Sequence, residues 1–124
     1  MQKVLIADDN ALFRTFLREK LHLRFPSLVI SEAKDGEDAL QQVLASPPDL
    51  IFMDIQLADG NGLGLTRLIR GLKPNVDVKV VVLTSYDQPD CRDGALISEA
   101  DHFISKQALI EIISSESPLD HSFF

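Results

Sequence analysis

Five polar residues each follow a short hydrophobic stretch of this 124-residue chain: Asp8, Asp9, Asp54, Thr84 and Lys106. Carboxylates can hold a hard divalent cation, and an activated carboxylate can also act as a nucleophile. A hydroxyl and an ammonium group can bind the oxygens of an anion. These residue types therefore indicate phosphate chemistry, provided that the fold brings them together.

The hydrophobic stretches have the length and continuity of strands that are buried on both faces. The expected strands cover residues 4–7, 28–30, 50–54, 78–83 and 102–104. Apolar residues at three- and four-residue spacing predict five helices, the first over residues 11–24 after a cap at Asp9 or Asn10. The other helices carry the periodic residues of 39–44, 65–72, 95–97 and 109–113, and Pro89 would begin the fourth.

Strands that alternate with helices predict a doubly wound parallel α/β sheet in a single domain. We expect five strands in the flavodoxin-like order 2-1-3-4-5, with the ligand site beyond their carboxyl ends. That order places four of the five strand ends, with their polar residues, on one edge of the sheet. The expected domain covers residues 1–115, and residues 116–124 form a tail or the start of a linker.

Three crowded carboxylates repel one another, by about 4 kcal/mol per pair at about 4 Å and an effective dielectric constant near 20. A cation must therefore lie among them. Oxygen ligands without His or Cys favour Mg²⁺, with Mn²⁺ as the alternative. Lys106 supplies a second positive charge, and the Thr84 hydroxyl can donate to a phosphoryl oxygen. Together these groups favour phosphoryl transfer to Asp54.

Each of these residues also has an ordinary structural interpretation. Asp8 and Asp9 could belong only to a helix cap, and Asp54 could merely open the glycine-rich turn that follows it. Thr84 could be a plain strand residue, and lysines such as Lys106 are usually solvated. The joint placement of these residues at one sheet edge is what favours a site.

Composition excludes several other classes of protein. The chain is 45% hydrophobic and 25% charged, as globular domains are, and its 12 basic residues are scattered in a chain with a net charge of −7. Direct nucleic-acid contact is therefore not expected. The single cysteine, Cys91, has no internal disulfide partner. No membrane-spanning or signal-like stretch is evident, so we expect a cytoplasmic protein without membrane contact.

Four segments resemble the marker segments of response-regulator receiver domains in two-component signalling, of the kind found in chemotaxis regulators. They are Asp8-Asp9 and residues 53–62, 83–85 and 103–106, and the resemblance covers residues 3–114. It implies that Asp54 accepts a phosphoryl group from the phosphohistidine of a histidine kinase or phosphotransfer protein. It also implies a signalling switch, which catalyses only its own phosphorylation and dephosphorylation, rather than an enzyme.

The resemblance further implies how the metal is held. Asp9, Asp54 and the backbone carbonyl of Gln56 would bind Mg²⁺, and Asp8 would act through a metal-bound water. Gln56 and Tyr86 occupy positions that tune dephosphorylation in the family, and a bulky Tyr86 would shield the acyl phosphate from water.

In the family, Thr84 and Lys106 contact the phosphoryl group. Thr84 moves toward it, and the aromatic residue at Phe103 turns inward, which alters the surface of the fourth helix, fifth strand and fifth helix. A plain core aromatic is the alternative for Phe103. Two departures stand out: Gln107 replaces a usual proline with a cis peptide, and Ala58 replaces a common proline.

Three rival functions remain open. A flavodoxin-type cofactor binder would prefer Ser, Thr or Gly after the first strand, where this chain has Asp8 and Asp9. A phosphatase with an aspartyl-phosphate intermediate would carry a second acid at Gln56. A receiver-like interaction module would never take phosphate. The chain is either a stand-alone receiver or the N-terminal part of a transcriptional regulator. The sequence allows a homodimer and does not distinguish one through helices four and five from one through helices one and five.

Overall fold

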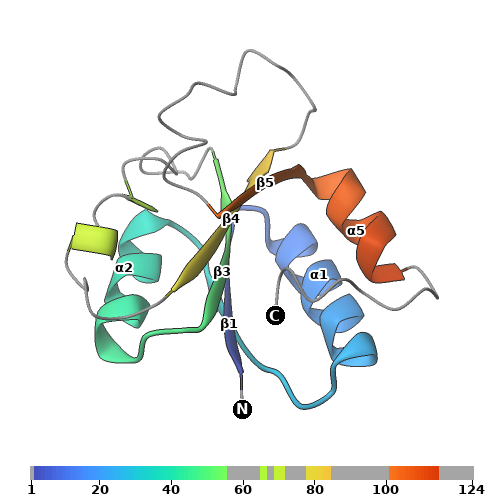
Figure 1. Cartoon of the computed structure of the whole chain (residues 1–124), viewed down its shortest axis with the longest axis horizontal. Coiled ribbons are helices and arrows are strands. Elements are labelled where there is room, and N and C mark those ends of the chain that lie inside the picture. The colour runs from blue at the N-terminus through green and yellow to red at the C-terminus, as the bar shows by residue number, and fades with distance from the viewer. Residues whose placement is uncertain (1, 56–64, 67–68, 72–77, 85–100, 115–124) are drawn as a thin grey trace.

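The computed structural model describes residues 2–55, 65–66, 69–71, 78–84 and 101–114. Within them, five parallel strands form one sheet in the order β2-β1-β3-β4-β5, which confirms the flavodoxin-like order. The strands are β1 Lys3–Ala7, β2 Val29–Ala33, β3 Leu50–Asp54, β4 Lys79–Thr84 and β5 His102–Ser105. The labelled helices are α1 Ala11–Arg24, α2 Gly36–Ala45 and α5 Lys106–Ser114 (Figure 1). Residues 65–66 and 69–71 are also helical, whereas the expected fourth helix lies outside the described residues.

The unbroken apolar stretches form the interior of the sheet. Every residue of β3 is buried, because β3 lies between β1 and β4 and both of its faces are covered by other elements. Strand β2 lies at the edge and alternates in exposure, which lets it include the polar residues Ser31 and Glu32. The predicted strand at 28–30 was therefore too short, because a half-exposed edge strand is not continuously apolar.

Side chains cap the starts of the three labelled helices. The Asn10 side chain accepts a hydrogen bond from the backbone of Phe13, which settles the choice between the two expected caps of α1. Asp35 caps α2 in the same way. The Ser105 hydroxyl accepts from the backbone of Ala108 in the first turn of α5. Each cap satisfies a backbone donor that the helix itself cannot pair.

Helices cover both faces of the sheet (Figure 1). Helices α1 and α5 lie together on one face, over a core that includes Leu17, Phe52 and Leu109. Helix α2 covers the other face over a second core, which includes Leu5, Val43 and Met53. Residues 50–53 point alternately into these two cores, so β3 is fixed from both sides. The carboxyl end of β3 is consequently a rigid place on which to mount a reactive group.

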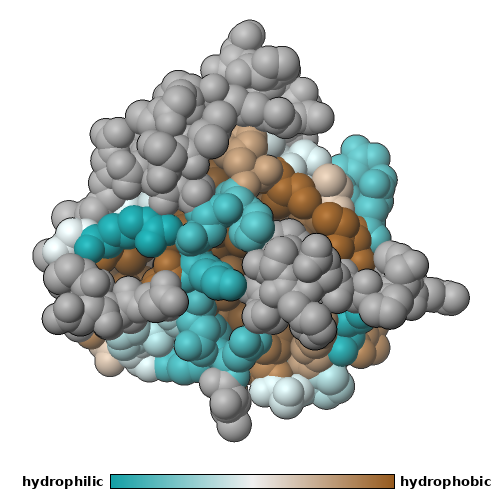
Figure 2. Space-filling view, in the orientation of Figure 1, coloured by the Kyte–Doolittle hydropathy of each residue, from teal (hydrophilic) through white to brown (hydrophobic). Residues whose placement is uncertain are grey.

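The surface is mixed in character. Figure 2 shows hydrophobic residues along the α5 side of the view, where Ile110 and Ile112 are only partly buried. Among the described residues, no helix combines the length and the apolar character that crossing a membrane would require.

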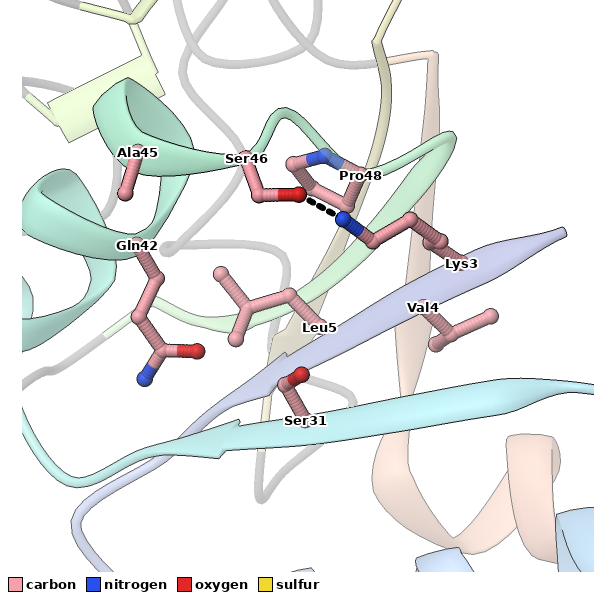
Figure 3. A pocket seen from close by; sticks show the side chains of 8 residues that line it. All are labelled: Lys3, Val4, Leu5, Ser31, Gln42, Ala45, Ser46 and Pro48. Atoms are coloured by element: carbon pink, nitrogen blue, oxygen red, sulfur yellow. Dashed lines mark hydrogen bonds between the residues drawn. The ribbon is translucent and has the colours of Figure 1, made fainter.

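A small pocket of about 150 Å³ lies at the amino-terminal end of β1, between the sheet and α2 (Figure 3). Leu5 lies within it, and Ser31 and Gln42 supply polar groups. The Lys3 ammonium donates to the Ser46 hydroxyl at one side. Because the predicted functional residues follow the opposite ends of the strands, this pocket is separate from the candidate site.

Candidate functional site

The fold brings the three aspartates together. Asp8 follows β1 directly, and Asp54 is the last residue of β3; the pairing of Ala7 with Met53 puts the two aspartates at the same level of adjacent strands. One carboxylate oxygen from each of Asp8, Asp9 and Asp54 lies within 4.8 Å of the others. Asp8 is fully buried and Asp54 is 6% exposed, whereas Asp9 is exposed. The cluster therefore opens to solvent on the Asp9 side.

Lys106 brings its charge into this cluster. It is the first residue of α5, directly after β5, and its Nζ lies 2.7 Å from Oδ2 of Asp8 and 3.6 Å from Oδ2 of Asp54. The three carboxylates carry −3 when ionised and the ammonium +1, so the cluster keeps two negative charges. Its oxygen-only donor set and this remaining charge fit a hard divalent cation.

Burial raises the pKa of Asp8 above its ordinary value, and the nearby charge of Asp54 raises it further. The Lys106 ammonium and the backbone N–H of Asn10 act in the opposite direction, by stabilising the ionised carboxylate. The net upward shift of the Asp8 pKa means that the protein alone does not fully offset the cost of burying the ionised carboxylate. A bound cation would supply the missing compensation.

Thr84 and Phe103 occupy adjacent strands beside the cluster. Thr84 ends β4 and is 3% exposed, one residue beyond Leu83, which pairs with Asp54. The backbone N–H of Ile55 donates to the Leu83 carbonyl at 2.9 Å, which fixes the chain immediately after Asp54. Phe103 pairs with Val82, packs against Val80 and Val82, and is partly buried.

Several expectations lie outside the described residues: the metal-ligating carbonyl of Gln56, the shield at Tyr86, and the loop position Ala58. Gln107 is described. Its peptide bond with Lys106 is trans, and its side chain donates to Glu111 at 3.3 Å. Lys106 nevertheless reaches the carboxylates, so the replacement of the usual proline does not remove the ammonium from the site.

A comparison with protein-family models matches residues 4–115 to the response regulator receiver domain. The chain belongs to this family. The receiver domain is 39% identical over 88 residues to the sensory transduction protein LytT of Bacillus cereus, covering 71% of this chain and 35% of LytT. It is 37% identical over 100 residues to the transcriptional regulatory protein LnrK of Bacillus subtilis, covering 81% of this chain and 42% of LnrK. The chain thus spans less than half the length of either relative.

Solved structures agree with the observed fold. The response regulator TrrA of Thermotoga maritima, solved in complex with Mg²⁺ and BeF, has a TM-score of 0.74 at 30% identity, covering 85% of this chain and 86% of that one. A CheY-like receiver domain from Methylobacillus flagellatus has a TM-score of 0.77 at 21% identity, covering 92% and 99%. The second likeness shows the fold alone.

Sequence reasoning missed the residues that hold the Asp8 loop of the receiver domain in place. The Arg14 guanidinium donates to the Asp8 carbonyl at 2.6 Å and to Glu32 at 3.0 Å. Arg18 adds a second contact to Glu32, at 3.1 Å. Arg14 and Arg18 are four residues apart on one side of α1, and that spacing was the available signal. It does not reveal their partner, because Glu32 belongs to the edge strand that was predicted too short.

Proposed function

We propose that this receiver domain accepts a phosphoryl group on Asp54 and thereby switches an output surface. In the reaction, an oxygen of the Asp54 carboxylate attacks phosphorus, the bond from phosphorus to the donor's histidine nitrogen breaks, and an acyl phosphate forms. The observation that carries the proposal is the Lys106 ammonium between two nearly buried carboxylates, Asp8 and Asp54. A buried carboxylate can gain further negative charge only where cations offset it.

We assign the metal site to Asp8, Asp9 and Asp54, with the backbone carbonyl of Gln56 as a further ligand. The convergence of the three carboxylates supports a hard cation, Mg²⁺ or alternatively Mn²⁺. The Mg²⁺ complex of the related regulator TrrA supports the same choice. When bound, the metal supplies charge neutralisation for the transferred group. Asp8 and Asp9 would hold and orient the metal, and Asp54 provides the attacking oxygen.

The proposed switch consists of Thr84 and Phe103. Thr84 would donate its hydroxyl to a phosphoryl oxygen on Asp54, and its position at the end of the neighbouring strand supports this role. Phe103 lies on β5 against Val80 and Val82 of β4 and is partly buried. A displacement of Thr84 toward the phosphoryl group would give the Phe103 ring space to move inward. That coupling would change the surface around β5 and α5.

The proposed donor is the phosphohistidine of a histidine kinase or phosphotransfer protein, and α1 offers a surface for it. Leu12, Phe16 and Leu23 are 83%, 44% and 79% exposed, and their four- and seven-residue spacing puts them on one side of the helix. This stripe begins two residues after the Asn10 cap, beside the Asp8 and Asp9 loop. A protein that delivers a phosphoryl group to Asp54 must cover the solvent-exposed opening of the site beside Asp9, and it would then contact the stripe.

Membership of the family and the two regulatory relatives support a role in a longer transcription regulator, with the receiver domain in residues 1–115 and a linker after it. In that arrangement another domain, rather than this one, contacts DNA. We place the protein in the cytoplasm and propose that phosphorylation favours a homodimer. Light scattering with and without beryllofluoride, a phosphoryl mimic, tests the dimer, and an unchanged monomer mass would contradict it.

Mass spectrometry after incubation with acetyl phosphate and Mg²⁺ tests the central proposal. The wild type should gain one labile phosphoryl group, whereas Asp54→Ala and wild type with excess chelator should gain none. Glu111→Ala, which removes an exposed acid on α5, is the matched control and should be labelled normally. An unlabelled wild type would favour the interaction module, and sustained turnover of a phosphomonoester would favour the phosphatase.

A further inference from the structure

The Lys106 ammonium has an aromatic neighbour in addition to its two carboxylates. Its Nζ lies over the ring of Phe13, 4.5 Å from the ring centroid. We infer that Phe13 is a positioning residue that holds this ammonium between Asp8 and Asp54 for phosphoryl transfer. The inference rests on the proposed function, because Lys106 needs positioning only if it meets a transferred group.

The contacts around Phe13 form a closed chain that begins and ends at Asp8. Oδ1 of Asp8 accepts from the backbone N–H of Asn10 at 2.8 Å, and the Asn10 side chain accepts from the backbone N–H of Phe13 at 3.2 Å. The Phe13 ring contacts Lys106, whose Nζ returns to Oδ2 of Asp8 at 2.7 Å. The backbone of Phe13 is therefore connected through Asn10 to the same carboxylate that the ammonium approaches. Loss of the ring face would remove one of the contacts that place the ammonium beside Asp8.

Three features of Lys106 favour such a positioning residue. Lys106 is the first residue of α5, and a positive charge at a helix N-terminus is disfavoured by the helix dipole. Its side chain also has a flexible four-carbon stem, which loses conformational freedom when its end is fixed. The side chain is only 15% exposed, so little water is available to compensate. The negative face of an aromatic ring attracts a partly desolvated ammonium and limits where it can lie.

The plain alternative is that Phe13 only fills space, since it packs against the core beneath α1 and α5. Phe13→Leu separates the two roles, because leucine keeps an apolar side chain but has no ring face. Phe13→Tyr keeps the ring face. Phe25→Leu is the matched control: Phe25 packs against the same core, but it lies at the opposite end of α1 from the site and takes no part in this closed chain of contacts.

The test measures labelling of Asp54 by acetyl phosphate at saturating Mg²⁺, together with Mg²⁺ affinity by calorimetry. For Phe13→Leu we expect the rate constant to fall about tenfold, equivalent to about 1.4 kcal/mol in the barrier. Its Mg²⁺ affinity should be unchanged or higher, because a less confined ammonium repels the metal less. Phe13→Tyr should retain most of the rate, and Phe25→Leu should match the wild type.

A wild-type rate in Phe13→Leu would overturn the inference, and so would equal slowing in Phe25→Leu or a parallel loss of Mg²⁺ affinity. The last two outcomes would indicate general damage to α1 instead of a displaced ammonium. If the wild type itself takes no label, the proposed function fails, and NMR then decides the positioning on its own. The Cε protons of Lys106 should be shielded by the ring in the wild type and lose that shift in Phe13→Leu; an unshifted wild-type signal would reject the contact.

Discussion

Lys106 lies closer to Asp8 than to Asp54: its Nζ is 2.7 Å from the first carboxylate and 3.6 Å from the second. The ammonium is therefore engaged mainly with the buried residue that would also serve the metal. A divalent cation and Lys106 compete for the negative charge of Asp8, whereas a phosphoryl group on Asp54 would attract both. The two cations should consequently oppose each other before transfer and cooperate during it.

Replacing Lys106 with methionine, which keeps the length of the side chain, should separate these two effects. Mg²⁺ should bind about fivefold more tightly, because about 1 kcal/mol of repulsion is removed. Labelling by acetyl phosphate should slow by about a hundredfold, because a charge that stabilises the transferred group is lost. Calorimetry and mass spectrometry measure the two quantities. Weaker Mg²⁺ binding in Lys106→Met would contradict the competition.

Asp8→Asn should make the metal-free protein more stable at neutral pH. The pKa of Asp8 is raised by burial, so the folded state holds its proton to higher pH than the unfolded state does. The stability that protonated Asp8 contributes is fully present below the unfolded pKa of 3.8 and is lost as pH rises through the folded pKa. Asparagine at position 8 cannot ionise, so Asp8→Asn does not lose this stability as pH rises.

Urea unfolding in the presence of a chelator, at pH values from 3.5 to 7.5 in roughly half-unit steps, measures this effect. The advantage of Asp8→Asn over the wild type should grow as pH rises. Adding Mg²⁺ at neutral pH should reverse the order, because the metal stabilises the wild type, with its three carboxylates, more than the variant, which keeps two. A wild type that exceeds the variant without metal at neutral pH would refute the prediction.

Arg14→Ala should lower the free energy of unfolding by about 1.5–3 kcal/mol, because the Asp8 carbonyl loses a charged donor. Arg18→Ala provides a matched comparison, since it removes the more exposed partner of the same Glu32 and should cost less than about 1 kcal/mol. Denaturant titration of both variants measures the difference. Equal losses would show that Glu32, and not the Asp8 carbonyl, is the important partner of Arg14.

Thr84→Val should still allow phosphorylation of Asp54, but phosphorylation should no longer move the Phe103 ring. Valine keeps the shape of the buried side chain and removes the hydroxyl that would donate to a phosphoryl oxygen. NMR signals of the Phe103 ring, recorded with and without beryllofluoride and Mg²⁺, report the coupling. They should shift in the wild type and in Thr84→Ser, but not in Thr84→Val. A full shift in Thr84→Val would exclude Thr84 from the switch.

The α1 stripe should matter only for a protein donor. Leu12→Ser should slow transfer from a phosphorylated histidine kinase that labels the wild type by about tenfold, as loss of one buried anchor at an interface does. Labelling by acetyl phosphate should not change, because a small donor needs no docking surface. Leu44→Ser, at a 45% exposed position on α2, is the control. Equal slowing with both donors would show that Leu12→Ser affects the site itself and not docking of the protein donor.

The interior of the fold could be predicted because burial and sequence pattern coincide there. Residues 50–54 are apolar up to Asp54 and form a strand buried on both faces, with the bounds that were expected. The same reasoning predicted a β2 that was too short, because Ser31 and Glu32 interrupt the apolar pattern. An edge strand can include them, since Ser31 is exposed to solvent and Glu32 accepts from Arg14. Local pattern thus identifies central strands more reliably than edge strands.

The candidate site could be predicted in its membership but not in its internal contacts. Parallel strand order places Asp8 and Asp54 side by side, so their proximity follows from topology. The contact of Phe13 with Lys106 does not, because it depends on how α1 and α5 pack against each other across 93 residues of sequence separation, from position 13 to position 106. Phe13 has the spacing of a core residue, and nothing in the sequence distinguishes its ring from any other.

Helix α5 begins at the very residue whose charge meets the site, and it continues for nine residues to Ser114. A helix of that length is a stiff rod of about 13 Å. A small tilt at Lys106, when the ammonium follows an arriving phosphoryl group, would be carried undiminished to the far end of that rod. The carboxyl end of α5 at Ser114 would thus receive the chemical event as a mechanical displacement.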